Sequence, residues 1–276
     1  MKKILIPTDF SELSEYALRT AENIAASLGA EIHALKVLPT PGDAYFDKKG
    51  KMLECEDYDM TKFEQERLNN EHKIQEWLKT AKNPVHIVVK FGNMIDDIIE
   101  YVKTQGIDLV VMGTSGANGW KEMFVGSNAE KIVRYSPVPV LTVKCDRPDW
   151  SIENILLVND FKNPQAENLE IVTALQAASQ AQIHLLKVEK TKETQREIFL
   201  QMEKFVQANA LENVEFHIQN DRHVEDGIFY FAHEHQIDLI IMGTHGRTGW
   251  EHLIKGSISE NVVNHLYKPI LTFKLA

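Results

Sequence analysis

The sequence predicts an α/β protein made of two tandem doubly wound domains, each with a five-stranded parallel sheet flanked by helices. Short β-branched runs alternate with segments of helical periodicity, which is the pattern of the βαβ units that build parallel sheets. The chain also repeats itself. Residues 112–144 align without a gap to residues 242–274, and 14 of these 33 positions are identical. A repeat of this length indicates a duplicated domain.

The start of each half repeats as well, and this locates an insertion. Residues 4–11 match 155–162 and residues 30–37 match 181–188, both at an offset of 151. The carboxyl-terminal repeat has an offset of 130, so the first copy carries 21 extra residues. We expect them as a loop insertion over 40–60, which is polar and shows no sustained period.

The elements of the first copy follow in order. Residues 4–7 are a continuous apolar run, as expected of a strand with helices on both faces of its sheet. Apolar residues at helical spacing over 17–28 predict a helix that ends at Gly29, a residue well suited to a helix C-cap. Further strands are predicted near 31–37, 85–90, 108–112 and 139–144.

The second copy shows the same order. Its first strand at 155–158 is followed by Asn163 and Pro164, a capping residue and a first-turn proline that together begin a helix. Arg147-Pro148-Asp149 breaks the pattern, which places the domains at 1–146 and 151–276. Later strands are predicted near 182–188, 213–218, 238–242 and 270–274.

Composition limits the classes of partner and the compartment. With 43% hydrophobic and 25% charged residues the chain is typical of globular domains. No apolar run approaches the roughly 20 residues of a membrane span or forms a signal-peptide core, so we expect a cytoplasmic protein without a membrane partner. Cys55 and Cys145 form neither a disulfide framework nor a CxxC motif. The net charge of −10 argues against nucleic acid as a partner.

Glycine-rich loops follow the fourth strand of each copy, in the pattern Gly-x2-Gly-x9-Gly-Ser. Glycine lacks a Cβ, so its backbone can bring N–H groups against phosphate oxygens, and a following helix N-terminus favours an anion. In a doubly wound sheet these loops meet the loop after the first strand, which carries Asp9 or Asp160. Alternatively, the glycines only shape a tight strand-to-helix turn.

At these residues the chain resembles the ATP-binding branch of the universal stress protein family, and the likeness covers nearly the whole chain as two copies. The resemblance implies an adenine-nucleotide alpha-hydrolase-like fold that binds ATP, or another adenine nucleotide, with Mg. In that family the aspartate after strand one lies at the nucleoside, a valine ending strand two meets adenine, and the glycine loop wraps the phosphates. The implied binding residues are Pro7, Thr8, Asp9, Val37, Met112, Gly113, Gly116, Gly126, Ser127 and Asn128 in the first copy, and Asp160, Val188, Met242, Gly243, Gly246, Gly256, Ser257 and Ile258 in the second.

The two copies depart from the family pattern in different places. The first keeps the Pro-Thr-Asp-Phe-Ser opening but has Ser115 where histidine is typical. The second keeps Thr-His-Gly-Arg-Thr-Gly at 244–249, but Lys162 follows its aspartate and could crowd or attract phosphate. We expect at least one of the two sites to bind an adenine nucleotide, and we favour the site of the first copy.

Several residues raise the question of catalysis or metal binding. His233, His235, His245 and His252 lie close in sequence, but His233 and His235 point to different faces of a helix, which favours solvated side chains over a zinc site. Asp9 and Asp160 could hold a divalent ion or act as a base, although ligand positioning is favoured. Neither a Walker lysine nor a nucleophile elbow occurs. The sequence therefore predicts no catalytic and no metal residues.

The leading hypothesis is a stress-response regulator that is not an enzyme, in which ATP occupancy changes loop order and association with an unknown protein partner. The alternatives are a slow ATP hydrolase or nucleotide-dependent transferase, and a scaffold with empty sites. In the family that the chain resembles, strand five pairs across a two-fold axis between subunits. Residues 140–143 and 270–273 are apolar edge strands that need cover, so we predict that the two copies pair in this way as an intramolecular pseudo-dimer. The sequence leaves open whether two chains form a homodimer.

Overall fold

The computed structural model describes ten ranges of the chain: 1–39, 45–46, 52–54, 60–114, 127–147, 150–163, 169–189, 193–221, 224–244 and 268–274. The strands of the first half are β1 (Lys3–Pro7), β2 (Glu31–Leu38), β5 (Val85–Phe91), β6 (Leu109–Gly113) and β7 (Val140–Val143). Those of the second half are β8 (Asn154–Val158), β9 (Gln182–Glu189), β10 (Val214–Asn220), β11 (Leu239–Thr244) and β12 (Ile270–Lys274). The expected strands are therefore confirmed.

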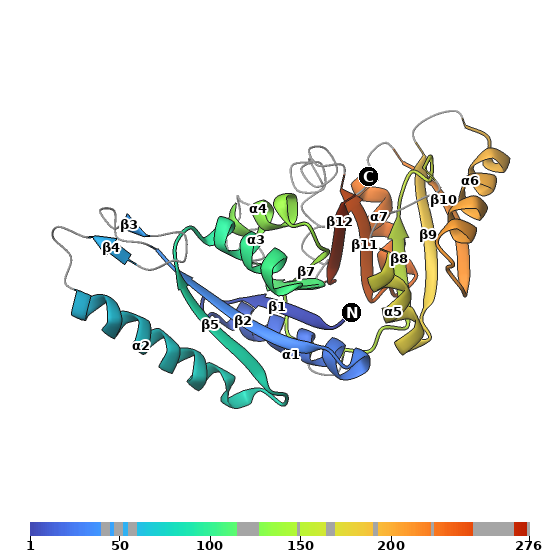
Figure 1. The fold of residues 1–276 in the computed structure, drawn as a ribbon. Helices are drawn as coiled ribbons and strands as arrows, with labels where there is room; N and C mark the ends of the chain where they lie inside the picture. The colour runs from blue at the N-terminus through green and yellow to red at the C-terminus, as the bar shows by residue number, and fades with distance from the viewer. Residues whose placement is uncertain are drawn as a thin grey trace.

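Helices occupy both faces of the sheet (Figure 1). They are α1 (Glu12–Leu28), α2 (Met60–Trp77), α3 (Met94–Gln105) and α4 (Ser127–Tyr135) in the first half, and α5 (Glu170–Ser179), α6 (Gln195–Ala208) and α7 (Val224–Glu234) in the second. A short 3-10 helix, η1, spans Leu78–Thr80. Helix α1 ends as predicted, because Gly29 adopts a left-handed φ of 66° and its N–H donates to the Ala25 carbonyl at 2.8 Å.

All ten long strands form one sheet in the order β10-β9-β8-β11-β12-β7-β6-β1-β2-β5. Each half repeats the same order, with its first strand between its second and fourth. Neighbours within a half are parallel. The order reverses between β1 and β6, and in a doubly wound sheet such a reversal opens a crevice at the carboxyl ends of the strands.

The halves join through their last strands, β7 and β12, which pair antiparallel with Leu141 opposite Leu271. Thr142 Oγ1 donates to the Ile270 carbonyl and Thr272 Oγ1 donates to the Val140 carbonyl, each at 3.2 Å. Helix α1 also packs against α5 across the junction. Each apolar last strand thereby covers the edge of the other.

Two apolar clusters fill the space on the two faces of the sheet. The cluster that includes Ile4 and Ile6 packs against α1, α2, α5 and α6 and continues through both halves. The cluster that includes Leu5 packs against α3, α4 and α7. Successive strand residues thus point to opposite faces, and both faces are buried, which explains the continuous apolar strand sequences.

The insertion in the first half differs from the expected loop. Within 40–60 the structure places β3 (Tyr45–Phe46) and β4 (Met52–Glu54), which pair antiparallel in a separate two-stranded sheet. In Figure 1 this pair lies beyond the end of the main sheet near α2. Strands of two and three residues are too short to show a period of two, so no pattern in the sequence predicts them. Pro164 lies outside the described residues, and α5 is described from Glu170.

Cleavage of the segment between Asp146 and Ser151 tests the junction. We expect the two halves to stay associated, because the β7–β12 ladder and the shared apolar cluster do not depend on chain continuity. Size-exclusion chromatography under native conditions, with the uncleaved chain as the control, should give one peak at the elution volume of the intact protein. Two separate peaks at half the mass would contradict the prediction.

Candidate functional site

A cavity of about 280 Å³ opens at the carboxyl ends of β1, β2 and β6, beside the reversal of strand order in the first half. The turn after β1 and parts of helices α1, α3 and α4 complete its walls. The cavity brings together six of the predicted binding residues, although they come from three separate segments of the sequence. These are Pro7, Thr8, Asp9, Val37, Met112 and Gly113.

Asp9 is held in a fixed position at this cavity by the first turn of α1. Its Oδ1 accepts from the Ser14 hydroxyl at 2.7 Å and from the Ser11 N–H at 3.0 Å. Ser11 is also the N-cap of α1, because its side chain accepts from the Ser14 N–H at 3.3 Å. The same serine pair therefore begins the helix and orients the carboxylate.

The charge state of Asp9 follows from these contacts. Partial burial on its own would raise the pKa of Asp9, but hydrogen bonds from Ser11 and Ser14 and the positive charge of Lys36 outweigh it and lower the pKa below its usual value of 3.8. Lys36 Nζ lies 5.0 Å from the centre of the Phe10 ring, beside the same turn. Asp9 is therefore a carboxylate at neutral pH and can accept hydrogen bonds from a ligand.

The turn that carries Asp9 has an unusual backbone. Phe10 adopts a left-handed φ of 69°, and its N–H donates to Thr8 Oγ1 at 3.1 Å. Phe161, its equivalent in the second half, has a φ of 58° and donates to Asn159 Oδ1 at 3.1 Å. A bulky residue rarely adopts this conformation, so the turn is a built feature of both copies.

The lining of the cavity has an apolar part and a polar part. The apolar part is formed by Leu35, Val37, Met94, Ile98 and Met112, and the polar part by Thr8, Asp9, Ser11, Ser14 and Thr114. Such a combination suits a small molecule with one flat apolar part and a polar remainder. Ala129 and Ile132 of α4 also line the cavity, so the amino-terminal part of this helix borders it and favours an anionic group there.

Close packing explains why residue 113 is glycine without reference to a ligand. A Cβ at this position would lie 2.3 Å from the carbonyl oxygen of Leu13 and 2.7 Å from its Cβ. The start of α1 approaches the end of β6 so closely that only glycine fits. The alternative in which the glycines shape the strand-to-helix region therefore accounts for Gly113, which also lines the cavity.

The remaining glycine-loop predictions lie outside the described residues. This holds for Gly116, Gly126, Gly246, Gly256, Ser257 and Ile258, and for the side chains of Ser127 and Asn128. Ser127 is placed as the first residue of α4, as predicted for the residue that opens this helix. His245 and His252 also lie outside the described residues.

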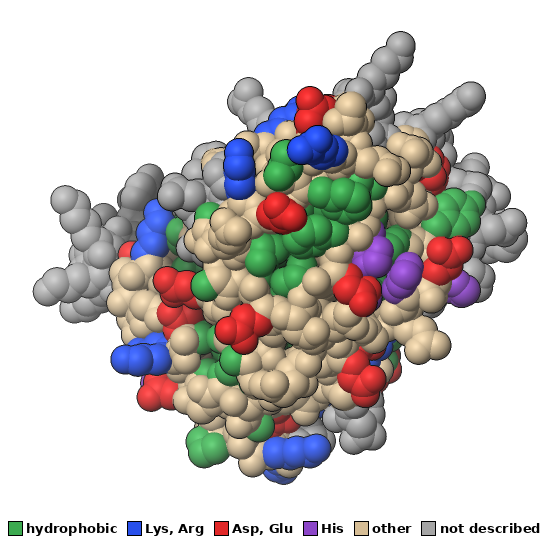
Figure 2. Space-filling view, turned by 90° about the vertical axis from the view of Figure 1, so that its right-hand side faces the viewer, with side chains coloured by type: hydrophobic (Ala, Val, Ile, Leu, Met, Phe, Trp, Pro, Cys, Tyr) green, Lys and Arg blue, Asp and Glu red, His purple; other side chains and the backbone are tan. Residues whose placement is uncertain are grey.

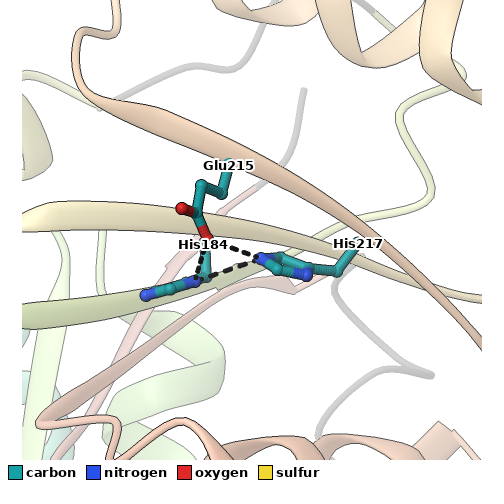
Figure 3. A group of neighbouring side chains, drawn as sticks. All are labelled: His184, Glu215 and His217. Atoms are coloured by element: carbon teal, nitrogen blue, oxygen red, sulfur yellow. Dashed lines mark hydrogen bonds and ion pairs between the residues drawn. The ribbon is translucent and has the colours of Figure 1, made fainter.

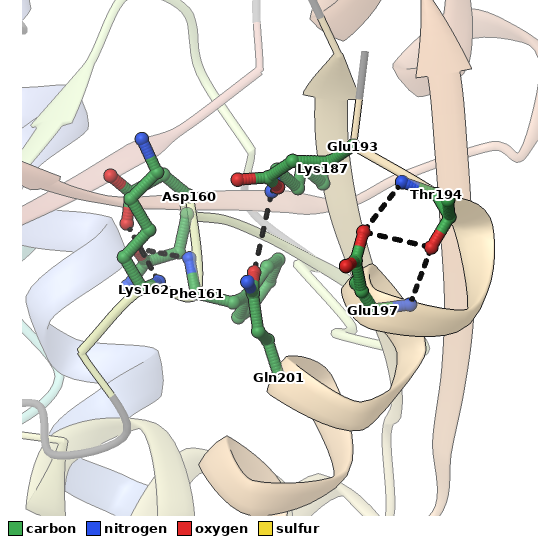
Figure 4. Close-up of polar contacts among 9 residues, drawn as sticks. Asp160, Phe161, Lys162, Lys187, Glu193, Thr194, Glu197 and Gln201 are labelled. Atoms are coloured by element: carbon green, nitrogen blue, oxygen red, sulfur yellow. Dashed lines mark hydrogen bonds and ion pairs between the residues drawn. The ribbon is translucent and has the colours of Figure 1, made fainter. Parts of the chain in front are cut away.

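The second half differs at the turn after its first strand. Asp160 Oδ1 accepts from the Lys162 N–H at 3.1 Å, and Lys162 occupies the position of Ser11. Phe161 is fully buried against Phe205, at 5.2 Å between ring centres. Figure 4 shows Lys187, the equivalent of Lys36, between Glu193 and Gln201. Within the described part of the chain, Asp160 thus lacks the serine hydroxyl that holds Asp9.

Val188, Met242 and Gly243 are described in the second half. Val188 packs at α7, where a Cβ on Gly227 would lie 3.0 Å from both of its methyl groups, and Met242 is buried at the end of β11. Their positions match those of Val37, Met112 and Gly113 by sequence repeat.

Sequence reasoning missed several cavity residues. Ser11 carried a detectable signal, since a serine directly before a helical apolar pattern marks a helix N-cap. The others are Leu13, Ser14, Leu35, Met94, Ile98, Thr114, Ala129 and Ile132. These have no local signature, because only the tertiary packing of their strands and helices brings them to the crevice.

The universal stress protein family model matches residues 1–144 and 154–274, which is almost the entire chain in two copies. The chain belongs to the universal stress protein family. Universal stress protein Slr1230 of Synechocystis sp. is 25% identical over 99% of this chain and 100% of its own length. Universal stress protein MJ0531 of Methanocaldococcus jannaschii is 32% identical over 52% of this chain and 82% of its own length.

Solved structures show the same fold. A universal stress protein from Archaeoglobus fulgidus aligns with a TM-score of 0.71 at 22% identity and covers 99% of this chain and 96% of that chain. A protein of unknown function from Pseudomonas aeruginosa, PA1789, aligns with a TM-score of 0.62 at 19% identity and covers 100% of this chain and 93% of that chain. In the described ranges, no helix combines the length and the apolar character that crossing a bilayer requires.

Replacement of Gly113 by alanine tests the close approach of α1 and β6. We expect Gly113→Ala to lower the free energy of unfolding by about 1–3 kcal/mol, the usual cost of overpacking, because the new methyl group meets backbone atoms of Leu13. Urea unfolding measures this change in the free energy of unfolding. The control is Gly106→Ala, which adds strain at a φ of 63° but has open space around its Cβ. A smaller loss for Gly113→Ala than for the control would contradict the steric explanation.

The hydrogen bond from Ser14 to Asp9 predicts a titration effect. We expect Ser14→Ala to raise the pKa of Asp9, because the carboxylate loses a donor that stabilises its charged form. The lowered native pKa stabilises the fold above the unfolded pKa of about 3.9, and this contribution disappears as the pH falls through the native pKa. Carbon-13 NMR of the Asp9 carboxyl group measures this pKa in the unaltered protein and in Ser14→Ala. Ser27→Ala, on the same helix but bonded to the Asn23 carbonyl, should leave the Asp9 titration unchanged.

Proposed function

We propose that this protein binds ATP, or another adenine nucleotide, with Mg²⁺ in the cavity of its first half and acts as a stress-response regulator with little or no catalysis. The observation that carries the proposal is the convergence of Asp9, Val37 and Gly113 on one cavity at the reversal of strand order. The resemblance to ATP-binding universal stress proteins implies these residues for a nucleotide, and the fold brings them to one cavity. Family membership supports a role in the response to stress.

The cavity chemistry fits the parts of a nucleotide. The apolar part of the lining suits a purine base, and the ionised Asp9 can accept hydrogen bonds from ribose hydroxyls. Phosphate groups fit the amino-terminal side of α4, where free backbone N–H groups supply donors on a protein of net charge −10. Mg²⁺ would be held mainly by phosphate oxygens and would neutralise the charge of the phosphate groups. The Asp9 carboxylate is the charged protein oxygen in the cavity lining that could contact it.

The cavity offers little for phosphoryl transfer. Its described lining contains one carboxylate, several hydroxyl groups and apolar side chains, and these include no lysine, arginine or histidine. Phosphoryl transfer needs positioned positive charge and an oriented nucleophile in addition to a phosphate cradle. This supports binding with slow or absent hydrolysis over the alternative of an ATP hydrolase or transferase.

Regulation would follow from ligand linkage. A nucleotide that binds one arrangement of the loops more tightly shifts the population toward that arrangement and changes the surface offered to a protein partner. Asp9 links the ligand to the first turn of α1, since the same serines contact both the carboxylate and the helix start. The partner is a protein of unknown identity.

Isothermal titration calorimetry with ATP and Mg²⁺ tests the proposal. We expect Asp9→Ala to weaken binding roughly 10- to 100-fold, because a hydrogen bond to a charged group contributes about 1.5–3 kcal/mol. Asp160→Ala is the matched control in the second half and should have the smaller effect. A solved universal stress protein that aligns with 51% of this chain, at a TM-score of 0.36, is in complex with cAMP, so cAMP is included as a competing ligand.

Two outcomes would overturn this function. Absence of heat with ATP, ADP and cAMP at millimolar concentration, together with no nucleotide in mass spectra of gently purified protein, would favour a scaffold with empty sites. Turnover of ATP at about 1 s⁻¹ or faster, within the usual range of enzymes, and loss of that turnover in Asp9→Ala would favour the hydrolase.

A further inference from the structure

A compact group of metal-ligating side chains lies in the second half, apart from the nucleotide cavity. His184 is on β9, and Glu215 and His217 are on the neighbouring strand β10, which is an edge of the main sheet. Figure 3 shows His184, Glu215 and His217 converging on one point. Figure 2 shows histidines grouped with acidic side chains on the surface at this end of the molecule. His184 lies near the amino end of its strand, whereas the nucleotide cavity lies at carboxyl ends.

The distances between the ligand atoms match a tetrahedral metal site. His184 Nδ1 is 3.1 Å from His217 Nε2, and Glu215 Oε2 is 3.6 Å from each of these nitrogens. Ligand atoms about 2.0–2.1 Å from Zn²⁺ in a tetrahedral arrangement are roughly 3.3 Å apart. The three atoms are therefore at about the spacing that one zinc ion requires.

The buried histidine is oriented for this role by an outer partner. The side chain of His184 is 6% exposed, and its Nε2 lies 3.3 Å from the carbonyl oxygen Oδ1 of Asn154. Since Asn154 Oδ1 can only accept, it places the His184 proton on Nε2 and leaves the Nδ1 lone pair directed at His217 and Glu215. A carbonyl that accepts from the distal nitrogen of a histidine is the usual support of a metal ligand.

His184 and His217 share a hydrogen bond. With the His184 proton on Nε2, its Nδ1 accepts from the His217 Nε2–H at 3.1 Å. A metal ion at this point would take the place of that proton, because it binds the lone pair of a deprotonated nitrogen.

The first half provides an internal comparison. His33 is the equivalent of His184, and its Nδ1 is bonded to the Tyr101 hydroxyl at 2.8 Å. In the second half Phe231 replaces this tyrosine, and its ring cannot form the bond. By strand register, His86 and Val88 stand where the second half has Glu215 and His217. The second half therefore lacks the hydroxyl partner of its buried histidine, and it has a carboxylate and an imidazole at the positions of His86 and Val88.

We propose that His184, His217 and Glu215 form a binding site for one Zn²⁺ ion, with water as the fourth ligand. Two imidazole nitrogens and a carboxylate are a donor set that zinc prefers, and three protein ligands leave one position open. The ion would link β9 to the edge strand β10 and so stabilise that edge. His235 lies beside this group, with its ring centre 5.2 Å from that of His217.

Metal binding to tag-free full-length protein tests the proposal, by calorimetry with Zn²⁺ and by the visible absorption of Co²⁺ as a spectroscopic probe. We expect one equivalent of Zn²⁺ per chain and a Co²⁺ spectrum of low coordination number. Asn154→Ala should weaken binding roughly 10- to 100-fold, the usual cost of losing an outer partner of a ligand. His217→Ala and Glu215→Gln should weaken it by more, because each removes a ligand atom from the ion.

Controls separate this site from the other histidines of the chain. His217→Ala changes a partly exposed side chain, so it tests the site even if His184→Ala fails to fold. Circular dichroism verifies that each variant is folded. His86→Ala alters the equivalent strand position in the first half and should leave Zn²⁺ affinity unchanged. Absence of stoichiometric Zn²⁺ binding, or an affinity that is the same in His217→Ala and the unaltered protein, would overturn the proposal.

Discussion

The antiparallel pairing of β7 and β12 is the constraint on which the rest of the structure depends. Each half ends in a short apolar strand that, left alone, would expose unpaired backbone groups and buried-type side chains. Pairing them converts two five-stranded sheets into one sheet of ten strands and lets an apolar cluster continue across the junction. The remaining edges of this ten-stranded sheet are β5 and β10.

Duplication within one chain allows the two halves to differ. Both keep the strand order and the left-handed phenylalanine after the first strand, because these belong to the shared fold. They differ in the polar groups placed on it. The first half holds Asp9 with Ser11 and Ser14, whereas the second half has Lys162 in place of Ser11 and a histidine pair on β9 and β10. The division suggests separate tasks for the two halves.

Much of the candidate nucleotide site was predictable from the sequence, because its residues follow strands at fixed places. Asp9 comes directly after β1, and Gly113 ends β6, so their meeting at the crevice follows from strand order. The histidine group was not predictable in the same way. His184 and His217 are 33 residues apart, and their meeting depends on the register in which β10 pairs with β9. A shift of one residue would have turned His217 to the opposite face.

The sequence by itself determined the duplicated α/β architecture, the strands and the position of Asp9, since hydrophobic period and internal repetition are properties of the chain alone. Only the tertiary structure decided why residue 113 must be glycine, which helices close the cavity, and which histidines lie together. Those features arise from contacts between segments far apart in the chain, such as Leu13 against Gly113 and β9 against β10. The free energy of such contacts depends on packing and register, which local sequence patterns do not encode.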